Sequence, residues 1–252
     1  MRTFASRAVS FGVCLSLLAA APATSVTGVL PAQESLSYDI EWRLIYAGSA
    51  HVNLSQKPTG WQTDVHVESG GLVSKLYKLN DTYRVQYDEG LCAASSTLDA
   101  AEGKRHRDTK VTFDAATKKA TYLERDLINN TVFRSSVIDV PACVQDVIGT
   151  LMKLRTLNLA PGQSVKLPIS DGKKFVNARV EAQEHEEIKT KLGVFKTTRY
   201  EAFLFNGALY TRSARLFVWL TDDARRLPVQ IRVRLQFVIG TITLTLEKDG
   251  TS

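Results

Sequence analysis

Apolar residues alternate with polar ones along most of this chain, and this period of two constrains the fold more than any other feature. In a β-strand successive side chains point to opposite faces, so the alternation is typical of strands buried on one face. The clearest runs cover residues 36–46, 50–54, 61–67, 83–87, 176–182, 214–220, 229–237 and 242–246. Many short alternating segments separated by turn residues predict a mainly β protein with an antiparallel sheet.

Turn residues predict where the chain reverses direction. Lys57-Pro58-Thr59-Gly60 predicts a hairpin in which His51 faces His66 across the two strands. Asn206-Gly207 is a strong signal for a type I′ turn and predicts a second hairpin. Ala47-Gly48 interrupts the first alternating run, and we expect a bend or a bulge there.

Two segments depart from the period of two. Leu72, Leu76 and Leu79 have helical spacing over one or two turns, and Asp146 to Leu157 predicts a longer helix. The apolar residues of this helix cover more than one face, so we expect it to plug or cap a curved sheet. The predicted fold is mainly β: a single antiparallel curved sheet over residues 35–249, closing into a barrel or half-barrel, with one internal or capping helix.

The first residues carry the features of a cleavable export signal. The first ten residues contain two arginines and no acid, and the next eleven are largely apolar. That apolar stretch is too short to span a bilayer, and Ala21-Pro22-Ala23 has the small-residue pattern of a cleavage site. We expect residues 1–23 to be removed as a signal peptide, with a cut after Ala32 as the alternative. Residues 24–34 are then expected to form a flexible leader.

Charge and hydropathy fit a protein of the cell envelope. No later stretch is apolar for long enough to cross a membrane, so we expect no transmembrane segment in the mature chain. The net charge is +6, and loss of Arg2 and Arg7 would lower it to +4, a moderate value that favours anionic surfaces. Basic residues form no run longer than Lys104 to Arg107, so nucleic acid is not an expected partner. We expect a periplasmic or otherwise exported protein, soluble or peripheral.

Cleavage would leave two cysteines, Cys92 and Cys143. An even count in an oxidising compartment predicts a disulfide between them, and the alternative is a pair of buried thiols. Neither cysteine has another Cys or a His at ligand spacing, so no metal is expected there. His51 and His66 could supply two metal ligands, but a solvated polar face is the favoured interpretation.

Motifs of catalysis are missing from the sequence. There is no G-x-S-x-G elbow, H-E-x-x-H pair or P-loop. Asp222-Asp223, or Asp81 with Asp88, could be read as hydrolase carboxylates, but the first pair is a predicted turn and the second straddles a strand. His185 lies in the acidic segment 184–187, which we interpret as a solvated turn. A non-catalytic protein without a cofactor is therefore favoured.

Arg155 stands out on the predicted helix because most of its neighbours are apolar. A buried arginine needs a carboxylate or phosphate partner, so Arg155 belongs either to a structural ion pair, which is favoured, or to a ligand site. If the helix covers only part of the sheet, the rest forms an apolar cleft with a Lys or Arg at its mouth. The candidate ligand-binding residues are Arg155, Leu151, Met152, Trp42 and Trp219.

A series of short motifs occurs in a characteristic order between residues 36 and 247. They are Leu36-x-Tyr38-x-Ile40-x-Trp42 before Ala47-Gly48, Lys104-Arg105 before Val111-x-Phe113-Asp114, Asp146-Val147 before Leu154-Arg155, Asp171-Gly172-Lys173-Lys174, Leu192-Gly193-Val194-Phe195, and Trp219-Leu220-Thr221-Asp222-Asp223 before Leu227-Pro228-Val229. In this order and spacing the chain resembles the exported bacterial family catalogued as domain of unknown function 3108. The resemblance implies an envelope protein of Gram-negative-type bacteria and supplies no catalytic residues. At the level of fold alone, the expected architecture is similar to lipoprotein-carrier half-barrels.

Three functions remain open. The favoured one is a non-catalytic binding or carrier module for an acyl chain, a lipid or another apolar envelope ligand. The alternative is a structural or assembly factor that engages another envelope protein, and the third is a hydrolase acting on an envelope polymer. A carrier predicts an internal apolar pocket, whereas an assembly factor predicts a filled interior and an exposed apolar patch.

Overall fold

The computed structural model describes residues 28–236 and 240–251. The signal peptide expected over 1–23, the start of the leader and Phe237 lie outside these residues. The described elements are β1 (Gln33–Trp42), β2 (Ile45–Lys57), β3 (Gly60–Ser69), α1 (Val73–Leu76), β4 (Leu79–Tyr87), β5 (Ala93–Glu102), β6 (Arg105–Asp114), β7 (Lys119–Asp126), β8 (Thr131–Asp139), α2 (Val147–Thr156), β9 (Ser164–Ser170), β10 (Phe175–Thr190), β11 (Gly193–Ala202), β12 (Ala214–Thr221), β13 (Pro228–Leu235) and β14 (Thr241–Asp249).

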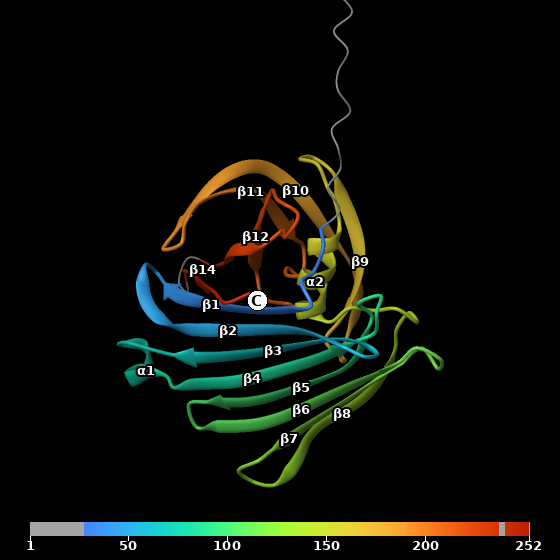
Figure 1. Ribbon diagram of the computed structural model, residues 1–252. Helices are drawn as coiled ribbons and strands as arrows, with labels where there is room; N and C mark the ends of the chain where they lie inside the picture. Colours follow the sequence, from blue (N-terminus) through green and yellow to red (C-terminus); the bar gives the residue numbers. More distant parts are fainter. Residues whose placement is uncertain (1–27, 237–239, 252) are drawn as a thin grey trace, which may run out of the picture.

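All of these strands join one antiparallel sheet of fourteen strands, in the order β8-β7-β6-β5-β4-β3-β2-β1-β14-β13-β12-β11-β10-β9. Strands β1 to β8 form one meander and β9 to β14 a second, and the two meanders meet where β1 pairs with β14. A twisted sheet of this width must curl. Figure 1 shows β10, β11 and β12 arching above the layer of β1 to β8, and the two edge strands, β8 and β9, are not paired with each other in the described chain. The predicted antiparallel curved sheet is confirmed, as a curled and open one.

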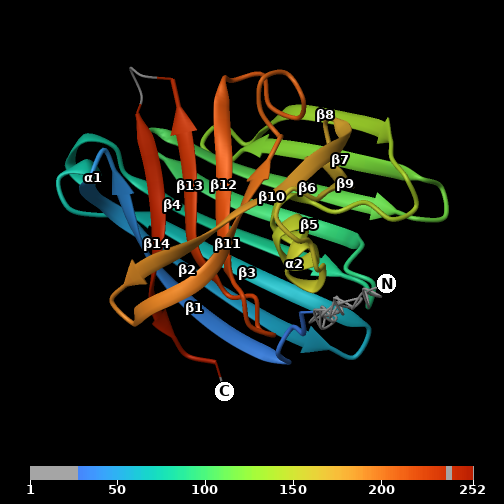
Figure 2. The ribbon, with the colours of Figure 1, turned by 90° about the horizontal axis from the view of Figure 1, so that it is seen from above.

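Helix α2 lies between the two halves of the curled sheet (Figures 1 and 2). Met152 belongs to the core cluster under the helix, and Leu154 belongs to the cluster formed with β9 to β12. Leu151 packs against both clusters. The helix predicted from Asp146 to Leu157 is therefore confirmed, together with its packing between two surfaces. Neither helix of the described chain has the length and hydropathy that crossing a membrane would require.

The first alternating run was expected to be a single strand over residues 36–46, and this expectation is wrong. Strand β1 ends at Trp42, and Arg43 and Leu44 form a tight turn with φ values of 51° and 67°. Leu44 is 91% exposed instead of facing the core. The alternation hides this reversal because the turn contains no Gly or Asn. The bulge expected at Ala47-Gly48 is confirmed by a shift in the β1–β2 register beside Ala47.

Asn206 and Gly207 form a turn, but the hairpin predicted around them is absent from the described strands. Both residues have positive φ, 59° and 93°, as a type I′ turn requires. The flanking residues are not strands, because β11 ends at Ala202 and β12 begins at Ala214. The connecting loop instead folds back on the protein and buries Leu209, which is 3% exposed.

The leader expected over residues 24–34 is fixed to the fold from residue 28 onwards. The N–H of Val29 donates to the carbonyl of Ala224 at 3.0 Å, and the N–H of Gln56 donates to the carbonyl of Ala32 at 2.7 Å. Leu30 is part of a core cluster. The expectation of a flexible leader is therefore wrong for residues 28–34, because this segment buries an apolar side chain and forms backbone hydrogen bonds with the rest of the protein.

Candidate functional site

A cavity of about 380 Å³ lies between the inner face of β3 to β7 and the N-terminal end of α2. Its floor consists of residues from the five strands: Val65, Val67, Asp81, Tyr83, Ser96, Leu98, Thr109, Val111 and Tyr122. Its other walls come from α2, the β9–β10 hairpin and the loop after β11: Val147, Ile148, Ser170, Asp171, Lys173 and Tyr210. Most of these side chains are apolar or aromatic, and a few polar groups converge among them, as in small-molecule sites.

The register of the sheet creates the floor. Two rows of cross-strand neighbours run side by side, with Val65, Tyr83, Leu98 and Thr109 in one and Ser96, Val111 and Tyr122 in the other. Because side chains alternate between faces, every member of these rows points to the same side of the sheet. The period of two in the sequence thus becomes a continuous, mostly apolar surface.

Asp146 fixes the helix above this floor. Its carboxylate accepts hydrogen bonds from the N–H groups of Ile148 (3.1 Å) and Gly149 (2.7 Å), so it caps the first turn of α2. It also accepts the hydroxyl of Tyr83 at 2.9 Å. Burial raises the pKa of Asp146, while the donated hydrogen bonds oppose that rise. The cap therefore ties the helical wall of the cavity to its floor.

The predicted disulfide is confirmed and holds the chain that leads into α2. Cys92 and Cys143 are bonded, which links the start of β5 to the segment before the helix. Beside the bond, the N–H of Ala93 donates to the carbonyl of Val144 at 2.8 Å. Gln145 then forms a parallel bridge with β9. The helix is consequently anchored to both meanders before it begins.

The β9–β10 hairpin closes one side of the cavity. Gly172 has φ of +83°, and a Cβ at this position would lie 2.7 Å from a methyl group of Val111. Only glycine permits both this backbone conformation and this close approach to the floor. Next to it, the ammonium of Lys173 lies 5.0 Å from the ring centroid of Tyr122 and 3.9 Å from a carboxylate oxygen of Asp171. The side chain of Lys173 is 37% exposed, and it lines the cavity.

Asp81 is the charged group of the floor. Burial raises its pKa to about 6, and the nearby carboxylate of Glu102 adds to the shift. One of its carboxylate oxygens, Oδ1, is buried and has no hydrogen-bond partner among the described residues. An acid with this pKa loses its charge as the pH falls through about 6, which makes the floor less polar.

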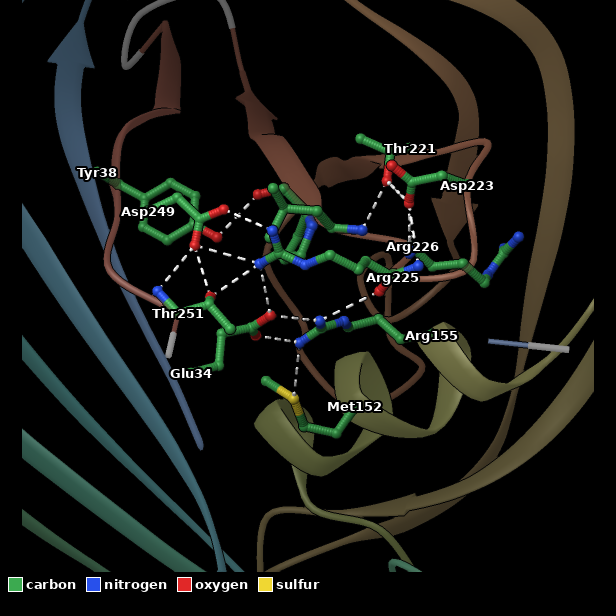
Figure 3. Close-up of polar contacts among 12 residues, drawn as sticks. Glu34, Tyr38, Met152, Arg155, Thr221, Asp223, Arg225, Arg226, Asp249 and Thr251 are labelled. Atoms are coloured by element: carbon green, nitrogen blue, oxygen red, sulfur yellow. Dashed lines mark hydrogen bonds and ion pairs between the residues drawn. The ribbon is translucent and has the colours of Figure 1, made fainter. Parts of the chain in front are cut away.

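Arg155 does not reach the cavity, because it forms a buried ion pair (Figure 3). Its two terminal nitrogens lie 2.6 and 2.8 Å from the carboxylate oxygens of Glu34 on β1, and both side chains are almost completely buried. Arg225 contacts the same carboxylate at 3.3 Å and also pairs with Asp249. The favoured interpretation of Arg155 as a structural ion pair agrees with this geometry.

The other candidate ligand-binding residues also lie outside the cavity lining. Leu151 and Met152 pack into the core clusters under and beside the helix. Trp219 is 2% exposed and donates its indole N–H to Glu186 at 2.9 Å. Trp42 is half-buried at the end of β1, with the guanidinium of Arg43 over its ring. The structure does not bring these residues together, and their contact with a ligand stays a prediction.

The histidine pair has the predicted register but separate partners. His51 faces His66 across β2 and β3. The Nδ1 atom of His51 lies 2.9 Å from the hydroxyl of Ser37, and that of His66 lies 3.3 Å from the hydroxyl of Thr82. Within residues 28–236 and 240–251, no three His, Cys, Asp or Glu side chains are grouped to hold a metal ion.

The carboxylate pairs considered for hydrolysis are not arranged as pairs. Asp81 faces the cavity, whereas Asp88 lies beyond the end of β4 and accepts the N–H of Cys92 at 2.8 Å. Seven residues of extended chain place the two about 23 Å apart, beyond the separations that glycosidases use. Asp222 accepts the hydroxyl of Thr198 at 2.6 Å, and Asp223 accepts N–H groups of its own turn.

The acidic segment 184–187 is part of strand β10, so its interpretation as a turn is wrong. The pairing register of β10 with β11 shifts between Ala182 and His185, as at a β-bulge. Glu184 and Glu186 bind the guanidinium of Arg199 at 2.5 and 2.6 Å. These acids therefore pair with an arginine of the neighbouring strand, and Glu184 remains exposed to solvent on β10.

Comparison with known families agrees with this architecture. A family model described as protein of unknown function (DUF3108) matches residues 37–247. The chain belongs to this family. Among curated proteins none matches the chain.

One of the similar solved structures shows the same kind of fold. A β-barrel-like protein of domain of unknown function DUF1849 from Brucella abortus is similar with a TM-score of 0.57 at 8% identity, over 88% of this chain and 98% of that one. A protein with a YmcC-like fold from Bacteroides fragilis has a TM-score of 0.38 at 10% identity, over 88% and 99% of the two chains. The first likeness shows a shared β-barrel-like fold, and the second carries no further conclusion.

Proposed function

We propose that this protein is an exported cell-envelope protein that binds an apolar or lipidic ligand, without catalysis, in the cavity under α2. The observation that carries the proposal is the cavity itself. It separates the N-terminal end of α2 from the sheet, whereas in a filled core the side chains of the helix and the sheet would be in contact there. Its volume of about 380 Å³ falls within the range of small-molecule sites.

The lining favours an acyl chain with an anionic head. The floor offers Val65, Leu98 and Val111 to a hydrocarbon, and Lys173 stands at the rim for a carboxylate or phosphate. Burial of ten methylenes would contribute roughly 8 kcal/mol before the entropy cost of ordering the chain. Micromolar affinity is therefore physically attainable for such a ligand.

Export is the second part of the proposal, and we propose that the signal peptide is cut after Ala23. Leu30 belongs to a core cluster, and Ala32 accepts a hydrogen bond from β2. A cut after Ala32 would remove Leu30 from the folded protein and leave a gap in the core. Intact mass of the exported protein should correspond to a chain beginning at Thr24, and a chain beginning at Gln33 would contradict the proposal.

An assembly factor is the second candidate, and the edge strand β8 favours it. Val132 and Val137 on this strand are 62% and 61% exposed, and β8 has no second partner strand in the described part of the chain. An exposed apolar edge can pair with a strand of another protein. A carrier and an assembly factor differ in what accompanies the protein when it is purified.

Mass spectrometry of small molecules extracted from the protein, purified without detergent from its native envelope, separates the two candidates. The carrier proposal predicts one class of lipid or fatty acid in a near-stoichiometric amount. This ligand should be lost when the protein is unfolded and washed. Recovery of the folded protein free of any such molecule, in complex with a second envelope protein, would contradict it.

A further inference from the structure

The turns of the meander from β1 to β8 lie alternately at two opposite ends of the molecule. The turns after β1, β3, β5 and β7 lie at one end, on the left in Figure 1, and those after β2, β4 and β6 lie at the other. We call the first end the α1 end; it consists of residues 43–46, 70–78, 103–105 and 127–130.

Large apolar side chains are exposed on the turns of the α1 end. Leu44 and Leu76 are 91% and 82% exposed, and Ile128 is 63% exposed. Helix α1 buries none of its own residues, although helices of this length depend on packing for their stability. The core of the protein therefore gives no reason for the leucine on this helix.

Three of these turns are packed together into one surface. The N–H of Gly70 donates to the carbonyl of Ala47 at 2.7 Å, and a Cβ at Gly70 would lie 2.7 Å from the ring of Tyr46. On the other side, the N–H of Gly103 donates to the carbonyl of Lys78 at 2.7 Å. The exposed leucines of the first two turns and the lysine of the third thus stand on a common, fixed platform.

The α1 end is also basic. Its four segments contain Arg43, Lys75, Lys78, Lys104 and Arg105. The acidic residues nearest to them are Glu68, Glu102, which faces Arg105 across β5 and β6, and Asp126, which accepts N–H groups of the last turn, so cations are in excess at this end. Arg232 and Arg234 line a hollow together with Arg43 and Leu44, which extends the positive surface to β13.

The opposite end of the meander has none of these features. Its turns carry Lys57, Asp88, Glu89 and Lys118, so both signs of charge are present. The large apolar residue of these turns, Leu91, is 4% exposed and belongs to the core. Exposed apolar turns combined with an excess of cations are therefore a property of one end.

We propose that the α1 end docks on an anionic lipid surface, with its leucines and tyrosines inserted among the headgroups and its lysines and arginines paired with phosphate. The core of a protein interface is depleted of lysine. Apolar and aromatic tips surrounded by Lys and Arg instead match the composition of interfacial membrane anchors, and each cation near an anionic leaflet adds to the attraction. This docking is independent of the cavity and goes beyond the proposed function.

Co-sedimentation with vesicles tests the docking. The mature protein should pellet with vesicles of equal parts phosphatidylglycerol and phosphatidylethanolamine, should pellet weakly with pure phosphatidylcholine, and should be released by high salt. Leu44→Ser with Leu76→Ser should lower the partition coefficient about tenfold or more. Lys75→Gln with Lys104→Gln should lower it about fivefold for each cation at low salt.

Two matched pairs of variants serve as controls. Val132→Ser with Val137→Ser removes exposed apolar groups from β8, and Lys57→Gln with Lys118→Gln removes cations from the opposite end; both should leave partition unchanged. Failure of the folded protein to bind the anionic vesicles would overturn the proposal, as would equal losses in the controls. A dimer in analytical ultracentrifugation that Leu44→Ser with Leu76→Ser dissolves, without any effect on vesicles, would assign the surface to a second copy instead.

Discussion

Asp81 makes the stability of the protein depend on pH. Its pKa in the folded protein is raised from 3.8 to about 6, chiefly by burial, so the folded state binds the proton more tightly than the unfolded state. Ionised Asp81 therefore lowers stability above pH 6, and this effect disappears as the pH falls from about 6 to about 4.

Asp81→Asn should raise the free energy of unfolding at about pH 7.5, by about 1 kcal/mol once solvent screening of this part-exposed group is taken into account. At about pH 4 the same substitution should have little effect. Chemical denaturation of the variant and the wild type at the two pH values measures both. A stabilisation of the same size at both would show that the charge of Asp81 is not the cause.

The ion pair of Glu34 and Arg155 is buried, so its two halves depend on each other. Glu34→Gln should lower the free energy of unfolding by about 3–5 kcal/mol, because Arg155 would keep its charge without a carboxylate. Glu34→Leu combined with Arg155→Met should recover most of that loss, since an apolar pair of similar size needs no desolvation of charge. The account would be contradicted if the double variant lost as much stability as Glu34→Leu and Arg155→Met lose together when each is made alone.

Helix α2 depends on its cap. Asp146→Ala removes an acceptor for two helix N–H groups and leaves the hydroxyl of Tyr83 without its partner. The expected loss is about 2–3 kcal/mol in the free energy of unfolding, and Asp146→Asn should lose less because it retains an acceptor oxygen. Denaturation curves followed by near-ultraviolet circular dichroism report the change, and an Asp146→Ala variant as stable as the wild type would refute the role of the cap.

Elements with a clear periodicity, turn signal or cysteine count could be predicted from the sequence, and elements without such a signal could not. The helix at Asp146, the hairpin that pairs His51 with His66 and the Cys92–Cys143 disulfide were all predictable from periodicity, turn residues and cysteine count. Strand β8 is exposed along most of its length, so no alternation marks it. The turn at Arg43 was missed because its residues are not typical of turns.

The curl of the whole sheet determines which residues line the cavity, and local sequence patterns do not predict this curl. Arg155 clearly needed a carboxylate, but its partner Glu34 is 121 residues away along the chain. The cavity floor needs the register of five strands at once, so alternation could indicate its apolar character but not its members. Lys173 and Gly172 became part of the site only because the β9–β10 hairpin folds over the other meander.

Displacement of a fluorescent fatty acid from the folded protein tests the central claim, that the cavity under α2 holds an apolar ligand. Leu98→Trp fills the cavity from its floor, whereas Thr97→Trp places the same ring on the opposite, exposed face of β5. We expect saturable micromolar binding by the wild type and by Thr97→Trp, and binding at least about tenfold weaker for Leu98→Trp. No saturable binding at tens of micromolar, or equal affinities for the two tryptophan variants, would contradict the claim.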